Sequence, residues 1–196
     1  MAPVVHLLHG IHTSRSSRRL ADLAGVVESA SGFKTVYHEY GNILALQTRY
    51  LNPIIAERLL PEIGDGDILV GHSNGNAIWL RCLRLGAPAS GMVLLNAALD
   101  DSIVFPSQLK WAHVYYNKGD EAVPVAAWAP KILLDPLWGD MGRDGYLGRD
   151  ARVKNFDCGA PERPPLSGHS AIIEPPAAIF WAHRWGARIG AEINAL

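Results

Sequence analysis

Residues 64–88 read GDGDILVGHSNGNAIWLRCLRLGAP, and this stretch decides the fold. Its turn-rich start leads into an apolar run at 67–71, which is typical of a buried strand. Apolar residues at helical spacing fill 74–85, and Gly86 would end a helix there. The stretch therefore predicts a strand, a sharp turn at Gly-His-Ser-Asn-Gly and a helix.

The same alternation continues along the chain. Further strands are predicted at 3–8, 34–40, 91–99, 111–116 and 152–156. Further helices are predicted at 13–32, 42–64 and 175–193, the last with Pro176 in its first turn. Alternating strands and helices favour a mostly parallel sheet with helices on both faces. We therefore expect an α/β protein, a three-layer α/β/α sandwich of about six strands, with residues 1–196 forming a single domain.

Two segments interrupt this pattern. Pro53 lies inside the helical pattern of 42–64, so we expect the helix to break or kink at Asn52-Pro53. Residues 136–151 are rich in Gly and Asp and show no period, which favours a long surface loop. The Asp spacing in that loop does not match a calcium-binding loop.

Composition limits the classes of function. The chain of 196 residues has 48% hydrophobic and 19% charged residues and a net charge of −1, as in an ordinary folded enzyme. Its one basic cluster, Arg15, Arg18 and Arg19, is typical of a solvated helix face, so we expect no nucleic-acid partner. Cys82 is predicted to be a small core residue, and its spacing from Cys158 fits neither a disulfide framework nor a zinc site.

The N-terminal sequence MAPVVHLLHG has no basic region, and its apolar run is short for a signal peptide. No apolar stretch reaches the length of a membrane span. We therefore expect neither a signal peptide nor a transmembrane segment, with the cytoplasm as the default location.

The segments that follow four of the predicted strands carry polar groups. They read HGIHTS (9–14), GHSNG (71–75), NKGDEAVP (117–124) and GAPERPPLSGHSAII (159–173). In an open parallel sheet such segments meet at the carboxyl edge. Together they resemble the α/β-hydrolase family, and the resemblance runs from residue 3 to the C-terminal helical pattern. It implies a small, uncapped, serine esterase or lipase-like protein that needs neither cofactor nor metal.

In this family a serine lies on a sharp turn between a strand and a helix, and the order along the chain is Ser, acid, His. The resemblance therefore implies Ser73 as the nucleophile, Asp120 as the acid and His169 as the general base. Gly71 and Gly75 fit the turn because larger side chains would collide with neighbouring backbone.

The acid has alternatives. Asp100 and Asp101 follow the fourth predicted strand, and some family members take their acid from that position. Asp144 and Asp150 are less favoured because they lie in the irregular segment.

The resemblance also assigns backbone and pocket groups. The backbone N–H groups of Asn74 and Ile11 would form the oxyanion hole, with His12 in reserve for Ile11. His12 and His72 are predicted to contact the substrate. The aromatic residues that could border a substrate groove are Trp128, Trp138 and Tyr146.

The short connection between the strands at 91–99 and 111–116 leaves no room for a helical cap, so we expect a fairly open site. The predicted activity is cleavage of a small-molecule carboxylic ester through an acyl-enzyme on Ser73. Thioesterase, amidase or cofactor-free peroxidase activity on the same residues is an alternative, as is a non-catalytic ligand-binding module. An NAD-binding sheet is disfavoured, because no G-x-G-x-x-G follows the first strand. The acyl group and the oligomeric state are left open.

Overall fold

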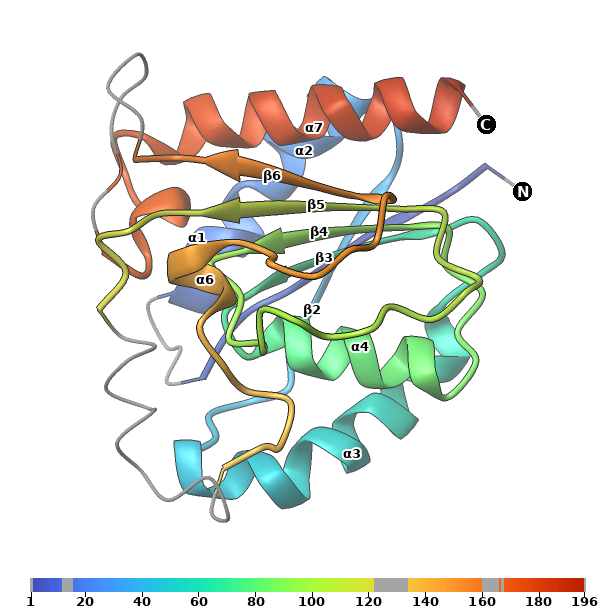
Figure 1. The fold of residues 1–196 in the computed structure, drawn as a ribbon. Coiled ribbons are helices and arrows are strands. Elements are labelled where there is room, and N and C mark those ends of the chain that lie inside the picture. The colour runs from blue at the N-terminus through green and yellow to red at the C-terminus, as the bar shows by residue number, and fades with distance from the viewer. Residues whose placement is uncertain (1, 12–15, 122–133, 160–165, 167, 196) are drawn as a thin grey trace.

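The computed structural model describes residues 2–11, 16–121, 134–159, 166 and 168–195. These residues form one sheet of six parallel strands in the order β2-β1-β3-β4-β5-β6. The strands are β1 (Val5–Leu8), β2 (Thr35–His38), β3 (Ile68–His72), β4 (Gly91–Leu95), β5 (Trp111–Tyr116) and β6 (Val153–Asp157). Because every pair of neighbouring strands is parallel, the carboxyl ends of all six strands lie at one edge of the sheet. The arrows of β5 and β6 in Figure 1 point toward this edge. The predicted parallel sheet is confirmed.

Helices cover both faces of the sheet (Figure 1). One face carries α1 (Ser16–Asp22), α2 (Ala24–Ser31) and α7 (Ala178–Asn194), and the other carries α3 (Thr48–Leu59) and α4 (Gly75–Arg84). The shorter elements are η1 (Ala45–Gln47), η2 (Leu60–Glu62), α6 (Met141–Asp144) and η3 (Ala171–Ile173). This arrangement is the expected three-layer α/β/α sandwich. None of the described helices is long and apolar enough to cross a membrane.

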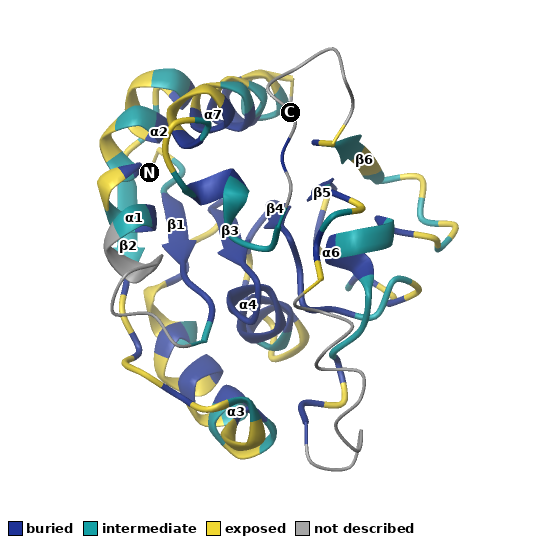
Figure 2. Ribbon diagram, turned by 90° about the vertical axis from the view of Figure 1, so that its left-hand side faces the viewer, coloured by how far each residue is buried: buried dark blue, intermediate teal, exposed yellow. Residues whose placement is uncertain are grey.

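The core has two halves, one on each face of the sheet. Successive side chains of a strand point to opposite faces, so Leu69 packs in the half that contains Trp79 of α4. Its neighbour Val70 packs in the half that contains Trp181 and Trp185 of α7. The central strands β1, β3 and β4 are therefore buried along their whole length (Figure 2). Cys82 is buried and reduced within the first half, as predicted.

The helix around Pro53 does not break, so the predicted break was wrong, while the alternative of a kink stays a prediction. Pro53 lies inside α3, which continues to Leu59. A proline inside a helix costs about 3 kcal/mol. Tertiary contacts offset this cost, because Asn52 is fully buried and hydrogen-bonded, and Ile55 and Leu59 pack into the core.

The segment 136–151 is not simply a surface loop, so this expectation is corrected. Leu137, Met141 and Tyr146 are buried in the half of the core that α3 and α4 share. The backbone N–H of Gly142 donates to Ala97 after β4, and the Gly142 carbonyl accepts from Asn117 after β5. The apolar residues of the segment follow neither a helical nor a strand period, which is why the pattern predicted no packing.

The other differences concern element bounds. The expected helix at 13–32 is two helices, α1 and α2, which meet at Leu23, and residues 13–15 lie outside the described residues. The C-terminal helix begins at Ala178, so Pro176 lies in the turn before it. Of the basic cluster, Arg19 forms an ion pair with Glu174.

Candidate active site

The chain makes a sharp turn at Ser73, between the end of β3 and the start of α4. Ser73 has a φ of 54°, which is a strained conformation for a residue other than glycine. Its backbone N–H donates to the carbonyl of Leu95 on β4 (3.0 Å), which helps to hold the turn. A Cβ at Gly75 would lie 2.5 Å from the carbonyl oxygen of Leu8, and one at Gly71 would overlap Asn76. The predicted crowding around both glycines is confirmed.

Three side chains form a hydrogen-bonded row at this turn. The Ser73 hydroxyl donates to Nε2 of His169 over 2.6 Å. Nδ1–H of His169 donates to the Asp120 carboxylate, 2.8 Å from Oδ2 and 3.0 Å from Oδ1. The carboxylate accepts only, which assigns this tautomer. The Asp120 side chain is fully buried, whereas that of His169 is 20% exposed. A histidine placed in this way can take the proton of the hydroxyl.

The connections after β5 and β6 bring these residues together. Asp120 lies in a turn closed by its own N–H, which donates to the Asn117 carbonyl (3.0 Å). The segment of His169 docks on the same turn, because the N–H of Gly168 donates to Gly119 (3.0 Å) and Nδ2 of Asn117 donates to the Gly168 carbonyl (3.3 Å). The parallel sheet thus joins groups that lie far apart in the sequence.

His72, which precedes the serine, lies beneath the segment of His169. Its Nε2–H donates to the backbone carbonyl of His169 (3.1 Å), and the residue is 2% exposed. Burial, and next the proximity of His169, lower the pKa of His72 to about 3, so its ring is neutral at pH 7. The hydrogen bond from His72 helps to hold the backbone of His169. The predicted contact of His72 with the substrate stays a prediction. His12 and Trp128 lie outside the described residues.

The loop after β1 presses against the serine. A Cβ at Gly10 would lie 2.7 Å from Cβ of Ser73. The Gly10 carbonyl accepts from the Tyr40 hydroxyl (2.6 Å) and from Nδ1–H of His9 (2.6 Å), and the His9 and Tyr40 rings stack at 4.3 Å. In a trans peptide the N–H points opposite to the C=O, so these bonds direct the Ile11 N–H away from Tyr40. Sequence reasoning did not find Tyr40.

The two amides assigned to an oxyanion hole are those of Ile11 and Asn74. Neither donates to an acceptor among the residues that the structure describes. The Asn74 side chain is fully buried, and its Oδ1 accepts from Asn52 Nδ2 (2.8 Å) and Trp138 Nε1 (2.9 Å). Asn52 also donates to Asp135 (2.6 Å). These contacts fix the residue after the serine, and no local pattern in the sequence pointed to Asn52 or Asp135 as its partners.

The alternative acids lie in other surroundings. Asp100 accepts from the N–H and hydroxyl of Ser102. Asp144 pairs with Arg143, and Asp150 with Arg152. No hydrogen bond to His169 is formed by Asp100 or Asp101 among the described residues. The geometry therefore favours Asp120 over these four residues.

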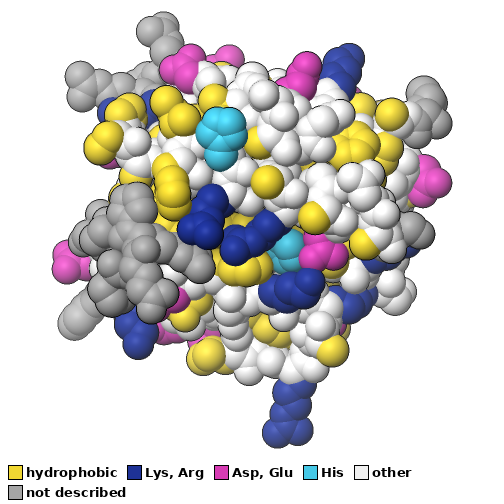
Figure 3. Space-filling view, turned by 90° about the horizontal axis from the view of Figure 1, so that it is seen from above, with side chains coloured by type: hydrophobic (Ala, Val, Ile, Leu, Met, Phe, Trp, Pro, Cys, Tyr) yellow, Lys and Arg dark blue, Asp and Glu magenta, His cyan; other side chains and the backbone are white. Residues whose placement is uncertain are grey.

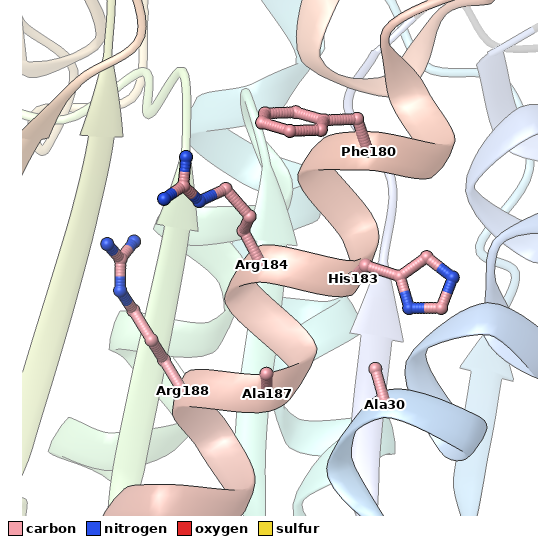
Figure 4. Close-up of a pocket in the computed structure, with 6 residues that line it drawn as sticks. All are labelled: Ala30, Phe180, His183, Arg184, Ala187 and Arg188. Carbon is pink, nitrogen blue, oxygen red and sulfur yellow. The ribbon is translucent and has the colours of Figure 1, made fainter. Parts of the chain in front are cut away.

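A shallow hollow lies away from the serine. It is lined by Ala30 of α2 and by residues of α7, namely Phe180, His183, Arg184, Ala187 and Arg188. Figure 4 shows His183 directed toward Ala30 and the two arginines directed to the other side of α7. Figure 3 looks down on the side of the molecule that carries α7, and basic side chains lie near the middle of that face. Ser73, Asp120 and His169 do not line this hollow. The described residues hold no group of side chains suited to a metal ion.

No protein-family model matches the chain, and no curated protein sequence matches it. The fold resembles that of a Xanthomonas campestris protein assigned to the α/β hydrolase superfamily, with 20% identity, a TM-score of 0.53 and coverage of 100% of both chains. It also resembles the esterase domain of a Rhodothermus marinus protein, with 11% identity, a TM-score of 0.58 and coverage of 98% of this chain and 87% of the other. For Aspergillus fumigatus lipase B the identity is 14%, the TM-score 0.55, and the coverage 90% of this chain and 50% of the other.

At these identities the likeness concerns the fold. The six parallel strands and the helices on both faces are the features of an α/β fold. The chain has the α/β-hydrolase fold.

Proposed function

We propose that the protein is a serine hydrolase that cleaves carboxylic esters through an acyl-enzyme on Ser73. The observation that carries the proposal is the row of Ser73, His169 and buried Asp120, with 2.6 Å between Oγ and Nε2 and 2.8 Å between Nδ1 and Oδ2. A serine hydroxyl is a weak nucleophile unless a neighbouring base removes its proton. The row supplies that base and a carboxylate that orients it.

The reaction would proceed in two halves. As Oγ of Ser73 attacks the ester carbonyl, its proton passes to Nε2 of His169, and Asp120 stabilises the imidazolium. The N–H groups of Asn74 and Ile11 would donate to the oxyanion of the tetrahedral intermediate. His169 then gives the proton to the leaving alcohol. In the second half, His169 takes a proton from water, which attacks the acyl-enzyme and releases the acid.

Support for an ester substrate comes from the structural neighbours, which include an esterase domain and a lipase. This support is an analogy between folds, because one fold carries many activities. The connection between β4 and β5, residues 96–110, is fully described and contains no helix, which agrees with the absence of a helical cap at that point. Ser73 is only 6% exposed, so a substrate must bring its carbonyl group close to a largely buried residue.

The test combines a fluorophosphonate probe with nitrophenyl esters of increasing acyl length. Wild type should be labelled and should hydrolyse at least one ester, and S73A should lose both properties. Activity should increase with pH through the range in which histidine loses its proton. Labelling that survives in S73A would refute the assignment of the nucleophile. Labelling without hydrolysis of any ester would refute the ester substrate and favour a thioester or an amide.

A further inference from the structure

Asn96 occupies the first position after β4, beside the carboxylate of Asp120. Its side chain is fully buried, and Nδ2 donates to Oδ2 of Asp120 over 3.0 Å. The backbone N–H of Asn96 donates to the carbonyl of Tyr115 on β5 (2.9 Å). The residue at the end of β4 is therefore tied to β5, and its side-chain amide donates to the carboxylate that accepts from His169.

The backbone at this position is strained. Asn96 has a φ of 42°, and only Ser73 shares a positive φ among the described residues other than glycine. Such a conformation costs free energy and persists where the surroundings impose it. Gly142 completes these surroundings, because a Cβ there would lie 2.8 Å from the carbonyl carbon of Asn96 and 2.9 Å from Oδ2 of Asp120.

The histidine alone does not distinguish the two oxygens of the Asp120 carboxylate. Both of its oxygens lie within hydrogen-bond distance of Nδ1 of His169, at 3.0 and 2.8 Å, so the histidine alone leaves two orientations open. A bond from Asn96 to Oδ2 distinguishes the oxygens. It also stabilises the ionised form, since a buried carboxylate without enough donors is costly.

The charged and titratable groups near Asp120 do not replace this amide. Among the described residues, His169, His72 and Arg143 interact electrostatically with Asp120. His72 is buried and neutral, and Arg143 forms a 2.7 Å ion pair with Asp144. Asn96 is an uncharged donor that contacts Oδ2 directly.

We infer that Asn96 is a positioning residue that fixes and keeps ionised the acid of the row, a role that rests on the proposed function. When the side-chain amide of Asn96 is removed, the negative charge on Asp120 depends more strongly on a protonated His169 for its stabilisation. His169 should therefore keep its proton to higher pH. The variant N96D retains a donor, because two buried carboxyl groups about 3 Å apart share one proton and the protonated group donates to the other. Glycine tolerates the positive φ, so N96G removes the amide without adding strain.

The test follows protonation of the His169 imidazole by NMR, which needs no substrate, together with the pH profile of kcat/KM on an ester that wild type hydrolyses. The midpoint of the titration should move to higher pH by about one unit in N96G and by less in N96D, which keeps a donor. The acid limb of the profile should move in the same direction, and kcat should fall about tenfold or more. V93A is the matched control, because Val93 is a buried residue of β4 that faces α7, and its loss should lower the thermal midpoint without moving either pH midpoint.

A folded N96G protein with unchanged midpoints would overturn the inference. That result would leave the proposed function intact if S73A abolishes probe labelling. Conversely, labelling of S73A would refute the assignment of Ser73 as the nucleophile. The NMR titration would still report whether Asn96 acts on the pair of Asp120 and His169.

Discussion

Replacement of Gly10 by alanine tests how closely the loop after β1 must approach the serine. A Cβ at this position would lie 2.7 Å from Cβ and 3.1 Å from Oγ of Ser73. Carbon atoms in contact lie about 3.5–4.0 Å apart, so the loop and the serine must separate by about 1 Å. Gly10 has no positive φ, and the backbone itself therefore accepts alanine.

The expected effect is on catalysis more than on folding. A displacement of about 1 Å in a reacting group can lower the rate about 100-fold. The shift would also move the N–H of Ile11, and loss of one oxyanion donor costs about 100- to 1000-fold in kcat. We therefore expect kcat/KM of G10A to fall at least about 100-fold, which corresponds to about 2.7 kcal/mol of transition-state stabilisation.

The assay measures ester hydrolysis and the rate of fluorophosphonate labelling well below the thermal midpoint of each variant. G25A is the control, because a Cβ at Gly25 of α2 would meet nothing within 4 Å and alanine favours the helix by about 1 kcal/mol. G25A should therefore keep full activity with equal or higher stability. A G10A protein that stays within twofold of wild type in both assays would refute the close packing of Gly10 and Ser73.

Three further predictions follow from the site and the core. D120N should lower kcat about 10⁴-fold, because an amide supports the wrong tautomer of His169. D100N should keep near-normal turnover. If D100N loses activity and D120N keeps it, the acid is Asp100. H72F removes the hydrogen bond to the His169 carbonyl and should lower kcat about tenfold with little change in KM. Steady-state kinetics would measure this effect, with H183F on the exposed side of α7 as the control. Burial lowers the pKa of His38 to about 4, so the unfolded chain binds its proton first as pH falls, and His38 should remove about 2 kcal/mol of stability between pH 7 and 5. Urea unfolding of wild type and H38Q should show this loss in wild type, and equal losses in both would contradict it.

The sequence predicted the elements of the sheet and the turn at Ser73 because both have local signals. Apolar runs marked the strands, and the glycines on each side of the serine marked a turn in which side chains would collide. The positions of Asp120 and His169 required the order known from a family, since nothing local shows that two segments meet. Their hydrogen bonds depend on the parallel alignment of β3, β5 and β6.

The supporting residues carried no such signal. Asn96 and Tyr40 act through contacts with residues more than twenty positions away, and a lone asparagine or tyrosine after a strand is ordinary. Pro53 misled for a related reason. The local rule against proline in a helix is correct, but the buried bonds of Asn52 and the packing of α3 outweigh it.

Ser73 and Asn96, which both have a positive φ, follow the ends of the neighbouring strands β3 and β4. The N–H of Ser73 donates to the carbonyl of Leu95, the residue before Asn96. Glycine at either position would relax the backbone, but it would remove the hydroxyl or the amide that the site uses. The sheet therefore holds a compromise between stability and activity at its carboxyl edge. At Ser73, selection for thermal stability alone would favour loss of the hydroxyl, whereas at Asn96 the amide also stabilises the buried carboxylate of Asp120. The hydroxyl of Ser73 therefore limits how stable an active form of this protein can become.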